Sequence, residues 1–268
     1  MANILDKIFE SKKEELASTQ RDLPLAELKG RARDQRLVKP LALTAAGEGS
    51  RIIAEIKRRT PFKGDLVEQF DPMKIAETYE QNGAAAISML TESRFFGGSL
   101  EYLSAASKKI SIPLLRKDFI FCDYQVHESR AFGADFYLLI ATSLDKNQLK
   151  DLLYLGEELG MTALVESHDE KDMEKAFYAG ATLLGINNRD LTSGKTDLNI
   201  ARRLLKMTQG MTDLTLVCES GIQSREEIVE FEQLGMHAFL IGETLMKANN
   251  VPDKLQELTG HGKTQPAG

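Results

Sequence analysis

The 268-residue sequence contains no tryptophan, few aromatic residues (7%) and only two cysteines, Cys122 and Cys218. Two cysteines cannot form a disulfide framework, so we expect a reducing, cytoplasmic environment and a fold stabilised by its hydrophobic core. No apolar run reaches the roughly 18 residues that a membrane span needs. The charged, amphipathic start also lacks the apolar segment of a signal peptide. We therefore expect no contact with a membrane.

A large excess of one sign of charge is also absent, because the net charge is only −6. A broad nucleic-acid-binding surface is not expected from such a balance, although a local basic pocket remains compatible with it. The four histidines, His127, His168, His237 and His261, lack paired ligand spacing, which argues against a zinc site. His168 lies two residues after Glu166, and we interpret it as an incidental loop residue. The sequence contains neither a GxSxG motif nor a P-loop.

One arrangement recurs along the chain: a helical pattern, a glycine, and then a short apolar run. Glycine adopts the left-handed conformation that caps a helix, so each repeat predicts a helix end followed by a strand. The runs are continuous and rich in Ile, Leu and Val, as is typical of strands buried on both faces. The five glycines are Gly83, Gly133, Gly160, Gly180 and Gly235. Three further strands are predicted at 51–57, 112–118 and 214–220.

Eight strands separated by amphipathic helical segments, such as 145–159, 169–179 and 224–234, predict a closed (β/α)8 barrel, the TIM-barrel form of the α/β class. An open doubly wound sheet is the alternative, but no GxGxxG follows the first strand. We expect a single domain. Its predicted parts are an N-terminal extension of two or three short helices over 1–45, the barrel over 46–255 and a disordered tail over 256–268.

Charged and polar residues stand where these strands end, which in a TIM barrel is the face that carries the active site. Each one alone is typical of the start of a solvated loop. Together they predict that lysines, carboxylates and an amide meet at one rim. The strand-end residues are Glu55, Lys57, Arg116, Lys117, Asp118, Glu166, Asn187, Glu219, Ser220, Gly242 and Glu243.

Glu55 and Lys57 lie two residues apart in the first strand, so both side chains point to the same face, together with Ile53. If that face is the barrel interior, both charges are buried. Because an unpaired buried charge costs several kcal/mol, we expect the two residues to pair with each other or with a substrate. The alternative is an outward-facing surface pair without a role.

Glycines indicate where an anion binds. Gly221 follows the seventh strand and Gly242 follows the eighth, and in TIM barrels these two loops commonly hold a phosphate. The pair therefore predicts a phosphorylated small-molecule ligand. The loop at 58–64 adds three cations and a hydroxyl beside Lys57, and it is a candidate lid over an anionic substrate.

These positions closely resemble the indole-3-glycerol phosphate synthase family. The resemblance is carried by IIAEIKRRTPFKG (52–64), LTESRFFGGS (90–99), IPLLRKDFI (112–120), LLIA (138–141), LVES (164–167), GINNRDL (185–191), CESGI (218–222) and FLIGETLM (239–246). It implies a TIM-barrel lyase of tryptophan biosynthesis that needs no cofactor and no metal. The implied reaction converts 1-(2-carboxyphenylamino)-1-deoxyribulose 5-phosphate into indole-3-glycerol phosphate, carbon dioxide and water.

The resemblance also implies residue roles. Lys117 is the candidate general acid, and Glu166 and Lys57 are candidates for the base and acid of dehydration, without a division of roles between them. Glu55 holds Lys57 and belongs to the catalytic set, and Asn187 and Glu219 orient the substrate and the lysines. The implied substrate-binding residues are Thr60, Phe96, Phe119, Leu138, Arg189, Ser220, Gly221, Gly242 and Glu243, the last through its backbone N–H.

One departure from the family concerns the loop after the first strand. The family usually has serine followed by Pro-Ser, where this chain has Thr60, Pro61 and Phe62. Threonine keeps the hydroxyl, whereas Phe62 changes the loop. Three alternatives are another phosphosugar barrel enzyme such as phosphoribosylanthranilate isomerase, a Schiff-base aldolase acting through Lys117, and a non-catalytic phosphometabolite-binding barrel. We expect a monomer or weak homo-oligomer.

Overall fold

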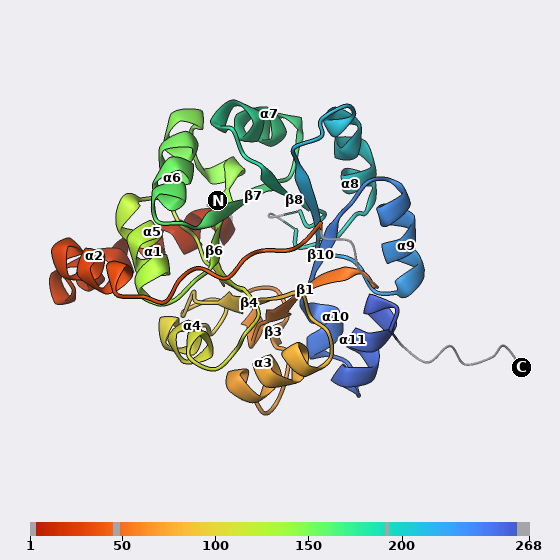
Figure 1. Cartoon of the computed structure of the whole chain (residues 1–268), viewed down its shortest axis with the longest axis horizontal. Helices are drawn as coiled ribbons and strands as arrows, with labels where there is room; N and C mark the ends of the chain where they lie inside the picture. Colours follow the sequence, from red (N-terminus) through yellow and green to blue (C-terminus); the bar gives the residue numbers. More distant parts are fainter. Residues whose placement is uncertain (1–3, 45–48, 191–192, 262–268) are drawn as a thin grey trace, which may run out of the picture.

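The computed structural model describes residues 4–44, 49–190 and 193–261. Within these ranges eight parallel strands close into a barrel, in the order β1-β10-β9-β8-β7-β6-β5-β4, and the helices form a ring around it (Figure 1). The predicted barrel is therefore confirmed. Its strands are β1 (Arg51–Ile56), β4 (Ala86–Leu90), β5 (Leu114–Lys117), β6 (Phe136–Ile140), β7 (Thr162–Ser167), β8 (Leu183–Asn187), β9 (Thr215–Glu219) and β10 (Ala238–Ile241).

The helices that cover the strands begin at local sequence signals. Asp71, Asp145 and Ser224 each cap a helix by accepting backbone N–H bonds, which satisfies donors that the first turn leaves free. The barrel helices are α3 (Pro72–Gln81), α4 (Leu100–Ser107), α5 (Asp123–Ala131), α6 (Lys146–Glu158), α7 (Glu170–Ala179), α8 (Asn199–Leu204), α9 (Arg225–Gln233), α10 (Glu243–Met246) and α11 (Val251–Thr259). Short 3₁₀ turns occupy Ala141–Ser143 and Leu205–Thr208.

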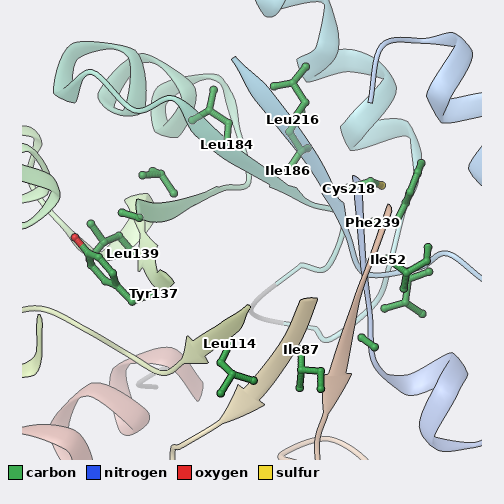
Figure 2. Close-up of a cluster of buried hydrophobic side chains, with 14 of the residues drawn as sticks. Ile52, Ile87, Leu114, Tyr137, Leu139, Leu184, Ile186, Leu216, Cys218 and Phe239 are labelled. Atoms are coloured by element: carbon green, nitrogen blue, oxygen red, sulfur yellow. The ribbon is translucent and has the colours of Figure 1, made fainter. Parts of the chain in front are cut away.

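Alternation along each strand separates two hydrophobic layers. Ile52, Ile87 and Leu114 point outward and pack between the barrel and its helices (Figure 2). Their neighbours Ile53 and Leu115 belong to a separate cluster that fills the barrel interior. Because both faces of the strands are buried, the strand sequences are continuously apolar.

The N-terminal extension consists of α1 (Ile4–Asp22) and α2 (Leu25–Arg33). The first of these is one helix of 19 residues, longer than the short helices expected. It lies across the barrel end at which the strands terminate, where the rings of Phe9 and Phe119 meet edge to face at 5.6 Å. Helix α2 packs against α5 through Leu28 and Tyr124.

Two segments differ from expectation. The loop after β1 contains a small antiparallel hairpin formed by β2 (Arg59–Thr60) and β3 (Gly64–Asp65). At the other end, α11 continues past residue 255 to Thr259, because Leu255 and Leu258 are fully buried one turn apart. The remainder of the expected tail, 262–268, lies outside the described residues. Over the ranges that the structure describes, no helix is long and apolar enough to cross a membrane.

Candidate active site

A pocket of about 140 Å³ opens where the strands of the barrel end. Apolar side chains and a few converging charged groups line it, as is typical of a small-molecule site. Its lining contains every strand-end, catalytic and substrate-binding residue that the sequence predicts, except Thr60 and Arg116. The predicted residues in the lining are Glu55, Lys57, Phe96, Lys117, Asp118, Phe119, Leu138, Glu166, Asn187, Arg189, Glu219, Ser220, Gly221, Gly242 and Glu243.

Thr60 is buried in the hairpin after β1, outside this lining. Its hydroxyl accepts a hydrogen bond from the Lys63 backbone N–H at 3.0 Å and so stabilises the hairpin turn. Phe62, the departure from the family pattern, packs against Gly194 in the loop after β8, where any side chain would collide with its ring. The hairpin therefore contacts the loop after β8.

Glu55 and Lys57 form the ion pair that their spacing predicts. Glu55 lies inside the barrel and is only 3% exposed. Burial alone would raise the pKa of Glu55, but the charges of Lys57 and Lys117 outweigh it and lower that pKa below its usual range. Gly242 packs directly on the Glu55 carboxylate, so a side chain at residue 242 would displace it.

Lys117 lies between two buried carboxylates. Its Nζ donates to Glu166 Oε2 at 2.9 Å and to Glu219 Oε2 at 2.8 Å. These residues come from β5, β7 and β9, so only closure of the barrel brings them together. Burial would lower the pKa of Lys117, but Glu166 and Glu219 outweigh that effect and raise the pKa above its ordinary value. Lys117 is therefore an ammonium ion at neutral pH.

The two carboxylates differ in their protonation. Burial would raise the pKa of Glu166, but Lys117, His168 and hydrogen bonds from Lys117 and Asn187 lower it to about 2. Burial raises the pKa of Glu219 to about 8. The charge of Lys117 lowers this pKa, but the negative charge of Glu166 raises it further, so Lys117 offsets the increase only in part. Repulsion between two ionised carboxylates so close together raises their free energy, which favours the state in which only one is ionised. Glu166 is thus the ionised member and Glu219 the protonated one near pH 7.

The far side of the pocket combines cations with free backbone groups. Ser220, with φ of 64°, and Gly221, with φ of 92°, both adopt the left-handed conformation after β9. For serine this is uncommon and indicates a functional constraint. The Glu243 side chain pairs with Lys63 at 2.6 Å and Arg189 at 3.6 Å. Glu243 is the first residue of α10, and backbone N–H groups in a first helical turn have no intrahelical partner.

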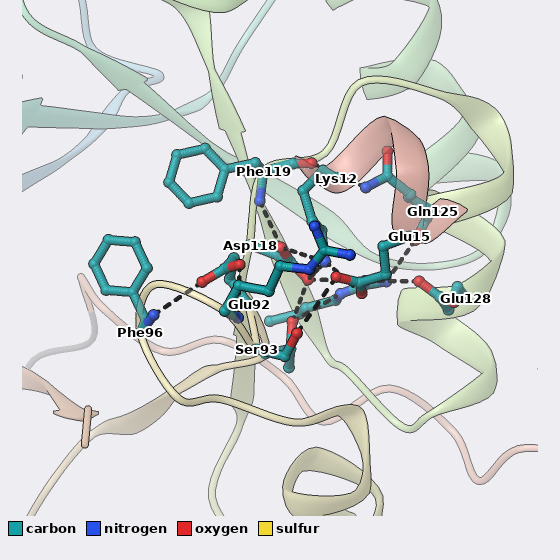
Figure 3. Close-up of polar contacts among 12 residues, drawn as sticks. Lys12, Glu15, Glu92, Ser93, Phe96, Asp118, Phe119, Gln125 and Glu128 are labelled. Atoms are coloured by element: carbon teal, nitrogen blue, oxygen red, sulfur yellow. Dashed lines mark hydrogen bonds and ion pairs between the residues drawn. The ribbon is translucent and has the colours of Figure 1, made fainter. Parts of the chain in front are cut away.

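Phe96, Phe119 and Leu138 form an apolar wall, with the rings of Phe96 and Phe119 5.9 Å apart. Phe96 is held by Glu92, whose carboxylate accepts the Phe96 backbone N–H at 2.9 Å (Figure 3). Such a wall excludes water and suits a planar aromatic ring.

Behind this wall lies a buried polar network that the sequence analysis did not resolve. Asp118 accepts from Lys12 at 3.1 Å, from Thr91 at 2.6 Å, from Arg116 at 3.1 Å and from the Phe119 N–H at 2.8 Å (Figure 3). Lys12 belongs to α1, so the network joins the N-terminal extension to the end of β5. This arrangement fixes the backbone on both sides of Lys117.

A family model described as indole-3-glycerol phosphate synthase matches residues 5–258. A protein of that name from Campylobacter jejuni (serotype O:6, strain 81116) is 44% identical over 95% of this chain and 99% of its own length. Another from Desulfosudis oleivorans is 45% identical over 96% of this chain and 99% of its own. The chain belongs to the indole-3-glycerol phosphate synthase family. The lyase function in tryptophan biosynthesis that the motifs predicted is thereby confirmed.

Solved structures agree at the level of the fold. The 3-hexulose-6-phosphate synthase from Salmonella typhimurium superposes with a TM-score of 0.64 at 14% identity, over 78% of this chain and 97% of that one. At this identity the likeness shows the barrel alone. As a member of the indole-3-glycerol phosphate synthase family, the chain acts on a phosphorylated small molecule.

Three features of this synthase pocket escaped the sequence analysis. Asp118 was recognised as a strand-end residue but not as the centre of a network. Gly185 leaves the space that the Glu219 carboxylate occupies, and no local pattern marks that need. His168, interpreted as incidental, lies with its Nε2 3.4 Å from Glu166 Oε1. Its spacing from Glu166, i and i+2 at a strand end, was the available signal.

Neither cysteine lines the pocket, which disfavours an isomerase that uses a cysteine and an aspartate. No group of three His, Cys, Asp or Glu residues in the described ranges could hold a metal ion. That the reaction needs no metal and no cofactor stays a prediction.

Proposed function

We propose that the pocket closes the ring of 1-(2-carboxyphenylamino)-1-deoxyribulose 5-phosphate to give indole-3-glycerol phosphate, carbon dioxide and water. The observation that supports this best is the position of Lys117 between Glu166 and Glu219, beside the Glu55–Lys57 pair. A ring closure with decarboxylation and dehydration needs acids and a base in one dry pocket, which these five residues supply.

In the first step the ring carbon that bears the carboxylate attacks the ketone carbonyl. Negative charge develops on the carbonyl oxygen, and the Lys117 ammonium ion donates a proton to it. The raised pKa of Lys117 keeps it protonated until the oxygen becomes basic. Carbon dioxide then leaves, and its electron pair returns to the ring system.

Dehydration then restores the aromatic indole. It removes a proton from the methylene carbon between the nitrogen and the former carbonyl carbon, and expels the hydroxyl group of the former carbonyl carbon as water. Glu166 and Lys57 share the base and acid roles of this step. Glu55 holds Lys57 through their ion pair, while Asn187 and Glu219 orient the reacting groups.

The remaining residues bind the two ends of the substrate. Backbone N–H groups of the loops after β9 and β10, together with a guanidinium group, hold the phosphate. The apolar wall holds the anthranilate ring. The phosphate-side residues are Thr60, Arg189, Ser220, Gly221, Gly242 and Glu243, and the ring-side residues are Phe96, Phe119 and Leu138. Thr60 contributes by stabilising the hairpin beside the phosphate.

We further propose a cytoplasmic protein that is a monomer or weak homo-oligomer. Both cysteines are free thiols, as expected in a reducing compartment. Of the exposed large apolar side chains, Tyr154 and Tyr178 flank Lys150 on the neighbouring helices α6 and α7, and Leu234 follows α9. Light scattering after gel filtration measures the mass directly, and a stable dimer at micromolar concentration would contradict this proposal.

Activity is tested by incubating the purified chain with the carboxyphenylamino-deoxyribulose phosphate and recording indole fluorescence. We expect a steady increase in fluorescence with release of one carbon dioxide per product molecule. A folded protein that produces no signal contradicts the proposed function.

A further inference from the structure

The proposed reaction consumes one proton per turnover. Its substrate carries an ionised carboxylate that leaves as neutral carbon dioxide, and its hydroxyl group leaves as water. Two protons are delivered, one to the carbonyl oxygen and one to the departing hydroxyl, but only one is removed from carbon. One acid of the site is therefore left without its proton and must be reprotonated from outside the reacting groups in each turnover.

His168 is placed to hold that proton. It follows β7 directly, and its Nε2 lies 3.4 Å from Glu166 Oε1, on the side of the carboxylate opposite Lys117. The His168 side chain is 14% exposed, whereas that of Glu166 is 4% exposed. His168 thus stands between the buried base and the exterior of the barrel.

Hydrogen bonding sets which nitrogen of His168 carries a proton. The Thr142 hydroxyl has a single proton, which it donates to Asp172 Oδ2. The Thr142 oxygen must therefore accept from His168 Nδ1, 3.2 Å away. The neutral ring then presents the bare Nε2 lone pair to the Glu166 carboxylate, an arrangement that is repulsive.

A proton on Nε2 removes this repulsion. Nε2 is buried and has no aligned hydrogen-bond partner among the residues that the structure describes. Burial lowers the pKa of His168, but the contacts with Asp172 and the charge of Glu166 outweigh it and raise the pKa above its ordinary value. The charged groups around the ring are Glu166, Asp172, Glu219, Lys175 and Lys117.

We propose that His168 is a positioning residue that stores the proton consumed in each turnover and returns it to Lys117 through Glu166. After Lys117 has protonated the carbonyl oxygen, the Nε2–H bond of the imidazolium breaks and the proton binds Glu166 Oε1. The protonated carboxyl group then gives up its proton to the neutral Lys117 amine, its hydrogen-bond partner. Glu166 is again a carboxylate, and His168 is a neutral ring that keeps its Nδ1–H. Solvent protonates the ring again after product leaves. This inference rests on the proposed role of Glu166.

The test compares His168→Gln with the wild type across pH. Glutamine can donate a hydrogen bond to Glu166 but cannot release a proton. We expect kcat at pH 6.5 to fall about tenfold with KM changed less than about twofold. The wild-type kcat should decline as pH rises through the pKa of His168, since the stored proton is lost. His168→Gln should lack that decline, whereas the matched control His127→Gln on α5 should retain it.

Asp172→Asn provides a second variant that keeps the side-chain shape. Without this carboxylate the imidazolium is less stable, so the alkaline decline should move to lower pH by about one unit. A folded His168→Gln protein with wild-type kcat and an unchanged pH profile overturns the inference. Glu166→Gln distinguishes this inference from the proposed function. If Glu166→Gln stays active, the proposed role of Glu166 is wrong. If Glu166→Gln is inactive while His168→Gln behaves like the wild type, only the role of His168 as a proton store is wrong.

Discussion

Three consecutive residues at the end of β5 belong to two different charge clusters. Lys117 points into the barrel, where it meets Glu166 and Glu219. Arg116 and Asp118 point the other way into the buried network with Lys12 and Glu128. The alternation of side chains along a strand produces this division. Adjacent charges in sequence therefore serve separate purposes in space.

The two clusters also differ in how well their groups are satisfied. Asp118 accepts four hydrogen bonds, and the pKa of this carboxyl is held far below its usual range because Lys12 and Arg116 outweigh its burial. In the pocket, Glu219 Oε1 is buried without a partner among the described residues. A fully paired network stabilises the fold, whereas a cluster with a free acceptor and a shared proton is ready for a substrate.

Among these variants, removal of the Lys117 side chain should give the largest effect, and the effect should be on activity rather than on stability. We expect Lys117→Ala to lower kcat by about 10²–10⁴, because the first step loses its acid. The melting temperature should change little, since Glu166 can take up a proton in place of its ion pair. Initial rates from indole fluorescence and a thermal melt measure both. Turnover close to wild type would refute the general-acid role.

Removing the charge of Asp118 should give the opposite result. Asp118→Asn leaves Arg116 and Lys12 with too little negative charge, and we expect a loss of about 3 kcal/mol in unfolding free energy. The kcat should fall much less than in Lys117→Ala. Denaturant unfolding at pH 7 provides the measurement, with Thr91→Val as a milder control within the same network. An unchanged midpoint would show that the network is not stabilising.

The clusters should also respond oppositely to pH. The pKa of Asp118 is lowered on folding, so its contribution to stability is present above about pH 4 and is lost as pH falls further. The pKa of Glu219 is raised to about 8 in the folded protein. The stability that Glu219 contributes is therefore present below the pKa of glutamate in the unfolded chain, and it is lost as pH rises towards 8. Glu219→Gln imitates the protonated acid. We expect it to melt about 2–4 °C higher than wild type at pH 8 and equally at pH 5.

A higher melting temperature for Glu219→Gln at both pH values would mean that Glu219 is ionised throughout. Its activity also separates the clusters, since kcat should fall while the fold gains stability.

The smallest effect is expected for Lys12→Met in α1. Asp118 keeps Thr91, Arg116 and the Phe119 N–H as donors, so the cost should be about 1 kcal/mol. Urea unfolding resolves a difference of this size. A loss as large as that of Asp118→Asn would show that Lys12, rather than Arg116, is the main partner of the carboxylate.

The sequence by itself was sufficient for the barrel. The glycine-then-apolar repeat at Gly83, Gly133 and Gly160 follows from local rules of capping and burial, and these rules do not depend on distant contacts. The pairing of Glu55 with Lys57 was equally predictable, because strand alternation is local. The boundary at residue 255 was misplaced although Leu255 and Leu258 carried a helical spacing.

Only the tertiary structure decided which charges meet. Lys117, Glu166 and Glu219 lie on strands separated by whole βα units, and their contacts depend on closure and register of the barrel. The same holds for Asp118 with Lys12, and for Gly185 beneath Glu219. His168 was set aside as a lone histidine although it stands two residues after Glu166 at a strand end. Its relation to Glu166 and Thr142 arises from the packing of β7 against the turn after β6, since side-chain contacts between segments are set by three-dimensional packing and not by neighbours in sequence.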